Sequence, residues 1–60
     1  MEIIKLTYLE TNEAQNIEVD DFRYCAQDLE LEDIYAMIDA LFYTKNPQTS
    51  ACRQYKIELP

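Results

Sequence analysis

The stretch LEDIYAMIDALFYT, residues 31–44, decides how this chain folds. Its apolar side chains recur at spacings of three and four, which places them along one face of an α-helix. Those positions are Leu31, Ile34, Tyr35, Ile38, Leu41 and Phe42, and Met37 widens the stripe. Acidic residues crowd its start, where the helix dipole favours negative charge, and Asn46-Pro47 ends it. The pattern predicts a single amphipathic helix over residues 31–44.

Before this helix, the chain contains two candidate strands. Residues 3–9, IIKLTYL, alternate so that Ile4, Leu6 and Tyr8 share one face. The polar residues 10–16 indicate a turn, and residues 17–24, IEVDDFRY, are interpreted as a second strand. Together the two strands would form an antiparallel hairpin.

A helical interpretation competes for the end of that second strand. Phe22, Cys25, Ala26 and Leu29 also fall at helical spacing, and Asp21 is a suitable residue to cap a short helix. Both interpretations of residues 21–29 stay open.

After the helix, residues 51–59 alternate again and predict a last strand. Arg53, Tyr55, Ile57 and Leu59 share one of its faces. The resulting order is strand, strand, helix, strand. The sequence therefore predicts one α+β domain over residues 1–60, a three-stranded antiparallel sheet with one helix packed on it.

The small size of the chain favours self-association. Sixty residues bury a small core, and small domains usually need a disulfide, a metal or a second copy. Cys25 and Cys52 are the only cysteines, the chain begins with an acid where a signal peptide carries positive charge, and its apolar runs are too short to span a bilayer. We expect reduced cysteines, a cytoplasmic location and a homodimer.

The residue types present argue against an enzyme. The chain has no histidine and no glycine, so the commonest general base and the glycine-rich phosphate loops are both excluded. Neither a closely spaced cysteine pair nor an acidic loop around a glycine is present, which excludes the usual zinc and calcium sites. We expect no catalytic residue, no cofactor and no metal.

The acidic residues are concentrated in one part of the chain. Ten of the twelve lie between Glu10 and Asp39, where Arg23 is the only base, so this block carries a net charge of −9. The flanking segments carry +2, and the whole chain −7. Such a charge repels nucleic acid and anionic membranes, so we expect neither as a direct partner.

Two interpretations of the acidic block are open. It is either a solvated face that maintains solubility or a surface for a basic partner, such as the DNA-binding cleft of another protein. Specific binding also needs apolar anchors, since charge mostly sets the rate of association. The helix offers three large aromatics for that role, with core packing as the alternative for each. The predicted partner-binding residues are Glu18, Asp20, Asp21, Glu32, Asp33, Tyr35, Asp39, Phe42 and Tyr43.

The chain also resembles a known family, the small acidic uracil-DNA glycosylase inhibitors of some bacterial viruses. The similar features are the short length, the acidic hairpin, the helix end IDALFY at residues 38–43, the turn at Asn46 and the strand YKIEL at residues 55–59. The predicted helix is longer than that of the family, and the hairpin turn lacks its glycine.

This resemblance implies a dimer with a hydrophobic pocket that takes up an apolar side chain from the DNA-binding loop of the enzyme. It places Phe42 and Tyr43 near the pocket and Glu18 or Asp20 on an acidic rim that imitates phosphates. The expected function is inhibition of a DNA-handling host enzyme, first of all uracil-DNA glycosylase. The alternatives are another viral inhibitor, of a CRISPR nuclease or RNA polymerase, and an assembly module without inhibitory activity.

Overall fold

The structure is a computed structural model that describes residues 2–60. Its elements are β1 (Ile3–Tyr8), β2 (Glu13–Glu18), the 3-10 turn η1 (Val19–Asp21), α1 (Phe22–Cys25), α2 (Leu31–Thr44), β3 (Gln48–Thr49) and β4 (Tyr55–Glu58). The strands form one antiparallel sheet in the order β2-β1-β4-β3. The α+β class is as predicted, but the sheet has four strands rather than three, and a second, short helix accompanies α2.

Helix α2 begins and ends where the sequence predicts. Lys45 closes it in the left-handed conformation, with φ 64°, and its N–H donates to the Leu41 carbonyl at 2.8 Å. The buried positions are Ile34, Met37 and Leu41. Met37 therefore belongs to the buried face of the helix rather than to its margin, and Tyr35 is left 47% exposed.

The hairpin differs from its prediction in its second strand. Strand β1 is confirmed, but β2 occupies residues 13–18, most of which were predicted to be turn. Asn12 takes a left-handed conformation, φ 62°, and its N–H donates to the Tyr8 carbonyl at 2.7 Å. Asparagine tolerates this conformation, so a short turn closes without glycine and the polar residues after it can pair with β1.

Residues 19–25 are helical, so the strand predicted over residues 17–24 is wrong beyond Glu18. The competing helical interpretation of residues 21–29 holds for Phe22–Cys25 but not for Leu29, which lies in a turn. Phe22 and Ala26, four residues apart, are both fully buried. Asp21 stands at the N-cap position of α1 but makes no side-chain capping bond. Burial of the Phe22 ring, rather than capping, accounts for this turn of helix.

The predicted last strand is also too long at its start, because residues 50–54 form a turn. Ser50 is buried, and its Oγ accepts hydrogen bonds from the backbone N–H groups of Gln54 and Tyr55 at 3.3 and 3.2 Å. Arg53 adopts a left-handed φ of 60° within the turn. The chain thereby folds Gln48–Thr49 back beside β4, which adds the unpredicted strand β3.

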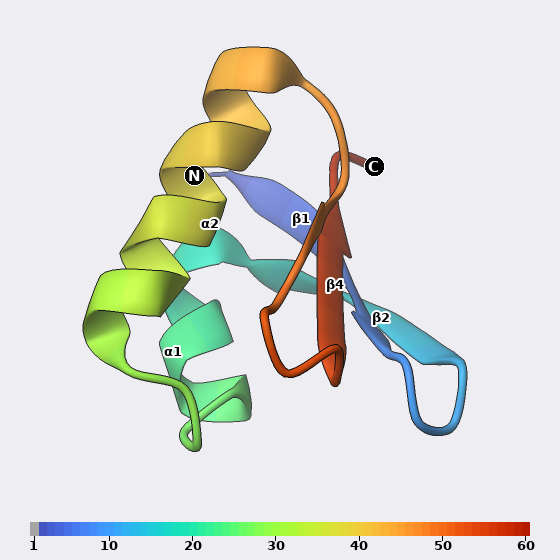
Figure 1. The fold of residues 1–60 in the computed structure, drawn as a ribbon. Helices are drawn as coiled ribbons and strands as arrows, with labels where there is room; N and C mark the ends of the chain where they lie inside the picture. Colours follow the sequence, from blue (N-terminus) through green and yellow to red (C-terminus); the bar gives the residue numbers. More distant parts are fainter. Residues whose placement is uncertain (1) are drawn as a thin grey trace.

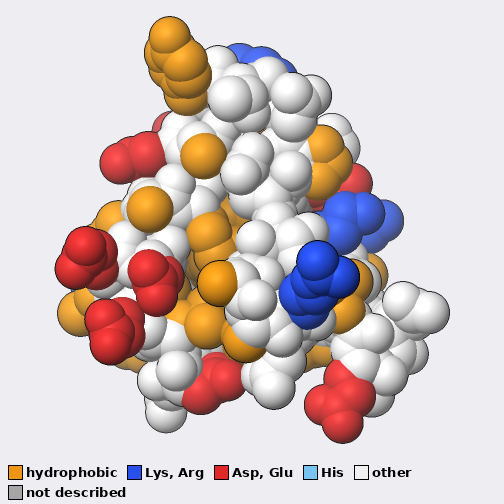
Figure 2. All heavy atoms as spheres, viewed as in Figure 1, with side chains coloured by type: hydrophobic (Ala, Val, Ile, Leu, Met, Phe, Trp, Pro, Cys, Tyr) orange, Lys and Arg blue, Asp and Glu red, His pale blue; other side chains and the backbone are white. Residues whose placement is uncertain are grey.

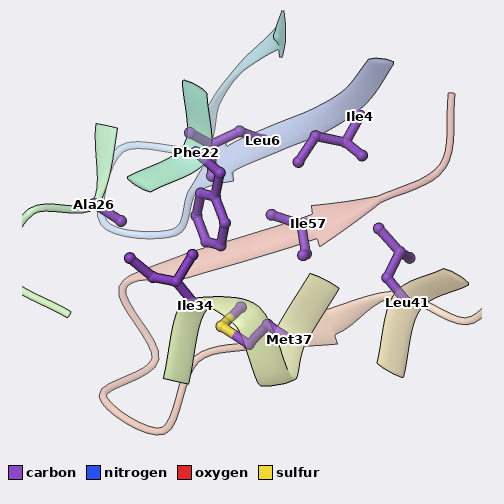
Figure 3. Close-up of a cluster of buried hydrophobic side chains, with 8 residues drawn as sticks. All are labelled: Ile4, Leu6, Phe22, Ala26, Ile34, Met37, Leu41 and Ile57. Atoms are coloured by element: carbon purple, nitrogen blue, oxygen red, sulfur yellow. The ribbon is translucent and has the colours of Figure 1, made fainter. Parts of the chain in front are cut away.

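The core lies between one face of the sheet and the helices, which gather on that side (Figure 1). Figure 3 shows the Phe22 ring between the strand residues and the side chain of Ile34. The buried apolar residues are Ile4, Leu6, Phe22, Ala26, Ile34, Met37, Leu41 and Ile57. Since Ile57 is fully buried within the chain, the apolar side of β4 has its cover without a second protomer.

Candidate partner-binding surface

One flank of α2 carries apolar side chains that the chain covers only in part. Leu31, Tyr35, Ile38 and Phe42 follow one another at intervals of four, three and four residues, and therefore line one side of the helix. We refer to these four residues as the outer stripe. Leu31 is 55% and Tyr35 47% exposed, and the other two are half-buried. The stripe is an apolar surface available to another molecule.

The short helical segment beside α2 borders this stripe. A shallow hollow of about 20 Å³ lies between the two, with Val19, Asp20 and Arg23 on one side and Ile34, Tyr35 and Ile38 on the other. Asp20 is thus placed at the edge of the apolar surface.

Arg23, the only base of the acidic block, is held by tyrosines. Its guanidinium donates to the Tyr35 hydroxyl at 3.4 Å and to the Tyr24 hydroxyl at 3.1 Å, and it lies 4.9 Å from the centre of the Tyr24 ring. The bond to Tyr35 contributes most to raising the pKa of Arg23 above its ordinary value. These contacts tie α1 to α2 and engage the guanidinium with neutral groups rather than with carboxylates.

Carboxylates accompany the stripe along α2 itself. Glu32 precedes Tyr35 by three residues and Asp39 follows it by four, so both lie beside that ring on the helix surface. Both are exposed, and the ion pair found among residues 2–60 is Lys5–Glu58, which involves neither. Figure 2 shows acidic side chains gathered beside hydrophobic ones over the first half of α2.

The structure brings together five of the nine predicted binding residues: Asp20, Glu32, Tyr35, Asp39 and Phe42. Asp21 lies in the same 3-10 turn as Asp20. Glu18 does not join them, because it pairs with Ile3 and shares with it the side of the sheet opposite the core. Asp33 lines a separate hollow on the other side of α2, beside Met37 and Ser50.

Tyr43 is also apart from this group. It is 88% exposed, the most of the large apolar side chains, and follows Asp39 by four residues rather than continuing the stripe. The sequence interpretation assigned Leu31 and Ile38 to the buried face, whereas the structure leaves Leu31 exposed and Ile38 half-buried. The sequence did contain a signal for this exposure. Helix α2 has seven apolar positions, and a helix that lies on one sheet buries a narrower face than seven such positions cover.

The cysteines and acids form no further site in the part that the structure describes. Cys25 is half-buried and Cys52 exposed, and neither is in a disulfide. No group of three or more cysteine or acidic side chains within residues 2–60 is arranged to hold a metal ion. In the same residues, no helix has the length and apolar character needed to cross a bilayer.

Comparison with known proteins does not assign this chain to a family. A scan against protein-family models finds no match, and neither a search of curated proteins nor one of solved structures finds a similar chain. The resemblance to glycosylase inhibitors therefore stays a prediction.

Proposed function

We propose that this protein binds the DNA-contacting surface of a DNA-handling enzyme and prevents DNA from reaching it. The observation that carries the proposal is the outer stripe with carboxylates on both sides, Asp20 on one and Glu32 and Asp39 on the other. Apolar anchors bordered by charge are typical of surfaces that bind another protein specifically.

The charge and the stripe have different parts in this binding. Residues 19–44 contain seven acidic residues and one base, a net charge of −6. A field of this sign attracts a cationic cleft from a distance and speeds association, and salt screens it. The stripe loses its contact with water only in the complex, so it sets how long the complex lasts.

The oligomeric state is part of the proposal. The inner side of β4 is already covered, so the surfaces left for a homodimer include the outer stripe, the open face of the sheet and the edge strands β2 and β3. Sedimentation at micromolar concentration measures it. A dimer held through the stripe should weaken when Tyr35 is changed to alanine, and a mass of about 7 kDa would remove the dimer from the proposal.

The first experiment measures uracil excision by uracil-DNA glycosylase with this protein in excess. We expect inhibition that Tyr35→Ala weakens by about thirtyfold, or 2 kcal/mol, because Tyr35 is the most accessible aromatic of the stripe. Tyr43→Ala is the matched control, since it removes an equally large ring outside the stripe, and it should change inhibition less than about threefold. Equal losses from the two variants would remove the stripe as the anchor.

A second experiment tests the charges. The triple variant Asp20→Asn, Glu32→Gln, Asp39→Asn should slow association by about tenfold at low salt and flatten its salt dependence. Neutralising Glu2, Glu18 and Glu58 changes the net charge equally at other places and should slow association less than about threefold. Equal effects would assign the attraction to net charge alone.

The alternatives have distinct outcomes. If uracil-DNA glycosylase is not inhibited but another DNA-binding protein is retained at low salt, the target is a different enzyme, such as a CRISPR nuclease or RNA polymerase. If none is retained, imitation of DNA is wrong. The protein would then be an assembly module with apolar contacts that are insensitive to salt.

A further inference from the structure

A second candidate site lies at the far end of the sheet, where β1 turns into β2. An open hollow of about 360 Å³ is formed there by both strands of the hairpin and the start of β4. The residues that matter for its chemistry are Tyr8, Glu10, Glu13, Gln15, Gln54 and Tyr55. Figure 1 shows the hairpin turn projecting beyond the helices. None of these residues belongs to the outer stripe.

Two tyrosines provide the aromatic part of the hollow. Tyr8 and Tyr55 are paired across β1 and β4, with ring centres 5.9 Å apart and ring planes at 64°. Such an edge-to-face pair does not bury both rings against each other as stacking would. Gln15 Nε2 donates to the Tyr8 hydroxyl at 3.3 Å, and the Tyr55 hydroxyl donates to Asp28. The two rings are therefore held in place by each other, by Gln15 of β2 and by Asp28 in the turn before α2.

Both phenols remain neutral at physiological pH. The hydrogen bond to Asp28, with burial, raises the pKa of Tyr55 to about 12. Burial, followed by the nearby Cys25 thiol, raises the pKa of Tyr8. The two rings that line the hollow are therefore aromatic surfaces without a charge of their own.

The rim of the hollow is anionic. Glu10 and Glu13 line it and are exposed, whereas no lysine or arginine is among the lining residues. The ion pair found in residues 2–60, Lys5–Glu58, leaves both carboxylates unengaged. Gln15 and Gln54 add amide groups. An aromatic wall below carboxylates complements a cation that is flat and carries several hydrogen-bond donors.

We propose that this hollow binds the side chain of an arginine presented by a partner protein. The guanidinium is planar, stacks on aromatic rings and donates to two carboxylates at once, whereas a lysine ammonium is a compact and more strongly hydrated charge. The volume is adequate for one such side chain and its neighbouring backbone. The site is separate from the outer stripe and does not rest on the function proposed for it.

The test is an NMR titration with three blocked tripeptides that carry arginine, citrulline or lysine at the centre. The arginine peptide should shift the amide signals of Tyr8, Glu13, Gln15 and Tyr55 saturably. Citrulline has nearly the shape of arginine without its charge, so its peptide should bind at least about tenfold more weakly, and the lysine peptide about threefold more weakly.

Matched variants separate this site from general attraction. Glu13→Gln should weaken the arginine peptide about fivefold, whereas Glu2→Gln removes the same charge at the other end of β1 and should weaken it less than about twofold. Both positions are exposed, and the spectrum of each free variant reports its fold. The proposal is overturned by unsaturated shifts up to about 20 mM, by equal binding of the citrulline or lysine peptide, or by equal effects of the two variants.

Discussion

The two outward surfaces of this protein, the outer flank of α2 and the open face of the sheet, differ in chemistry. The flank of α2 exposes Leu31 and Tyr35 among unpaired carboxylates. Apart from Ile3, which is 40% exposed, the sheet face presents mainly polar side chains, and Lys5 and Glu58 on neighbouring strands form an ion pair at 3.7 Å. The sheet face thus balances its own charges, whereas the helix flank leaves large apolar side chains and carboxylates exposed side by side.

The difference follows from the two periods of secondary structure. A strand sends successive side chains to opposite faces, so polar residues at alternate positions are enough to finish the open face. A helix turns by 3.6 residues, and the seven apolar positions of α2 cover a wider arc than the sheet beneath can bury. The apolar positions that the sheet does not bury, together with the acidic residues beside them, distinguish the helix flank from the open face of the sheet.

The largest expected effect concerns the core that supports both surfaces. Phe22→Ala should lower the free energy of unfolding by about 3–5 kcal/mol, because the ring is fully buried between the sheet and α2. That is most of the stability expected for a chain of this size. Urea unfolding followed by circular dichroism measures it.

Tyr24→Ala is the control for this change, since Tyr24 lies in the same turn of helix but is 60% exposed. Tyr24→Ala should lower the free energy of unfolding by less than about 1 kcal/mol. A similar loss in both variants would mean that α1 is held by its surface contacts rather than by Phe22.

The next effect concerns the hydrogen bond that the Tyr55 hydroxyl of β4 donates to Asp28, in the turn before α2. The pKa of Tyr55 is raised from about 10 to about 12, so the folded chain holds this proton more tightly. The stabilisation is present in full below pH 10 and is lost as the pH rises through 12. Tyr55→Phe should therefore cost about 1 kcal/mol at pH 7 and nothing above pH 12.

Absorbance at the phenolate band provides an independent measurement. The absorbance change near pH 12 should be smaller by one phenolate in Tyr55→Phe, since the raised pKa of Tyr8 leaves that residue to titrate at high pH as well, and the Tyr55 step should move toward lower pH in Asp28→Asn. Tyr43→Phe, at an exposed position, should retain it. An absorbance change near pH 12 that is undiminished in Tyr55→Phe would contradict the assignment.

A smaller effect tests whether the carboxylates on and beside α2 repel one another in the folded protein. Asp20→Asn with Asp39→Asn should raise the free energy of unfolding by about 0.5–1 kcal/mol at low salt, because these carboxylates repel others nearby, and the gain should shrink as salt is added. Glu18→Gln with Glu58→Gln should not stabilise, since it removes the partner of Lys5. Equal gains from both pairs would show that the surfaces do not differ in this respect.

The smallest expected effect compares the backbone in the two regions. Lys45 ends α2 and Arg53 lies in the turn before β4, and both have positive φ in a chain without glycine. Glycine relieves that strain but makes the unfolded chain more flexible, so Lys45→Gly and Arg53→Gly should each stabilise by about 0.5 kcal/mol. Thermal melting should show a rise of about 2–4 °C.

Lys56→Gly provides the contrast, because Lys56 lies within β4, outside the positive-φ positions. It should destabilise by about 1 kcal/mol. A gain there, or a loss at either of the other two positions, would contradict the explanation by backbone strain.

The sequence by itself determined the two most periodic elements, β1 and α2, with their bounds nearly correct. Each contains a run of apolar residues whose spacing fits one kind of secondary structure alone. It also placed Tyr35, Asp39 and Phe42 on the helix and concentrated the acidic charge in one part of the chain. These properties are local, so a linear pattern is enough to specify them.

Only the tertiary structure decided the rest, because the deciding contacts join distant residues. Polar β2 is a strand since it pairs with β1, and β3 exists because the Ser50 turn folds it against β4. The placement of α2 on the sheet buried Met37 and left Tyr35 outside. Tyr8 and Tyr55, far apart in the chain, meet through the pairing of β1 with β4. No local spacing encodes that meeting, which depends on the register of two strands.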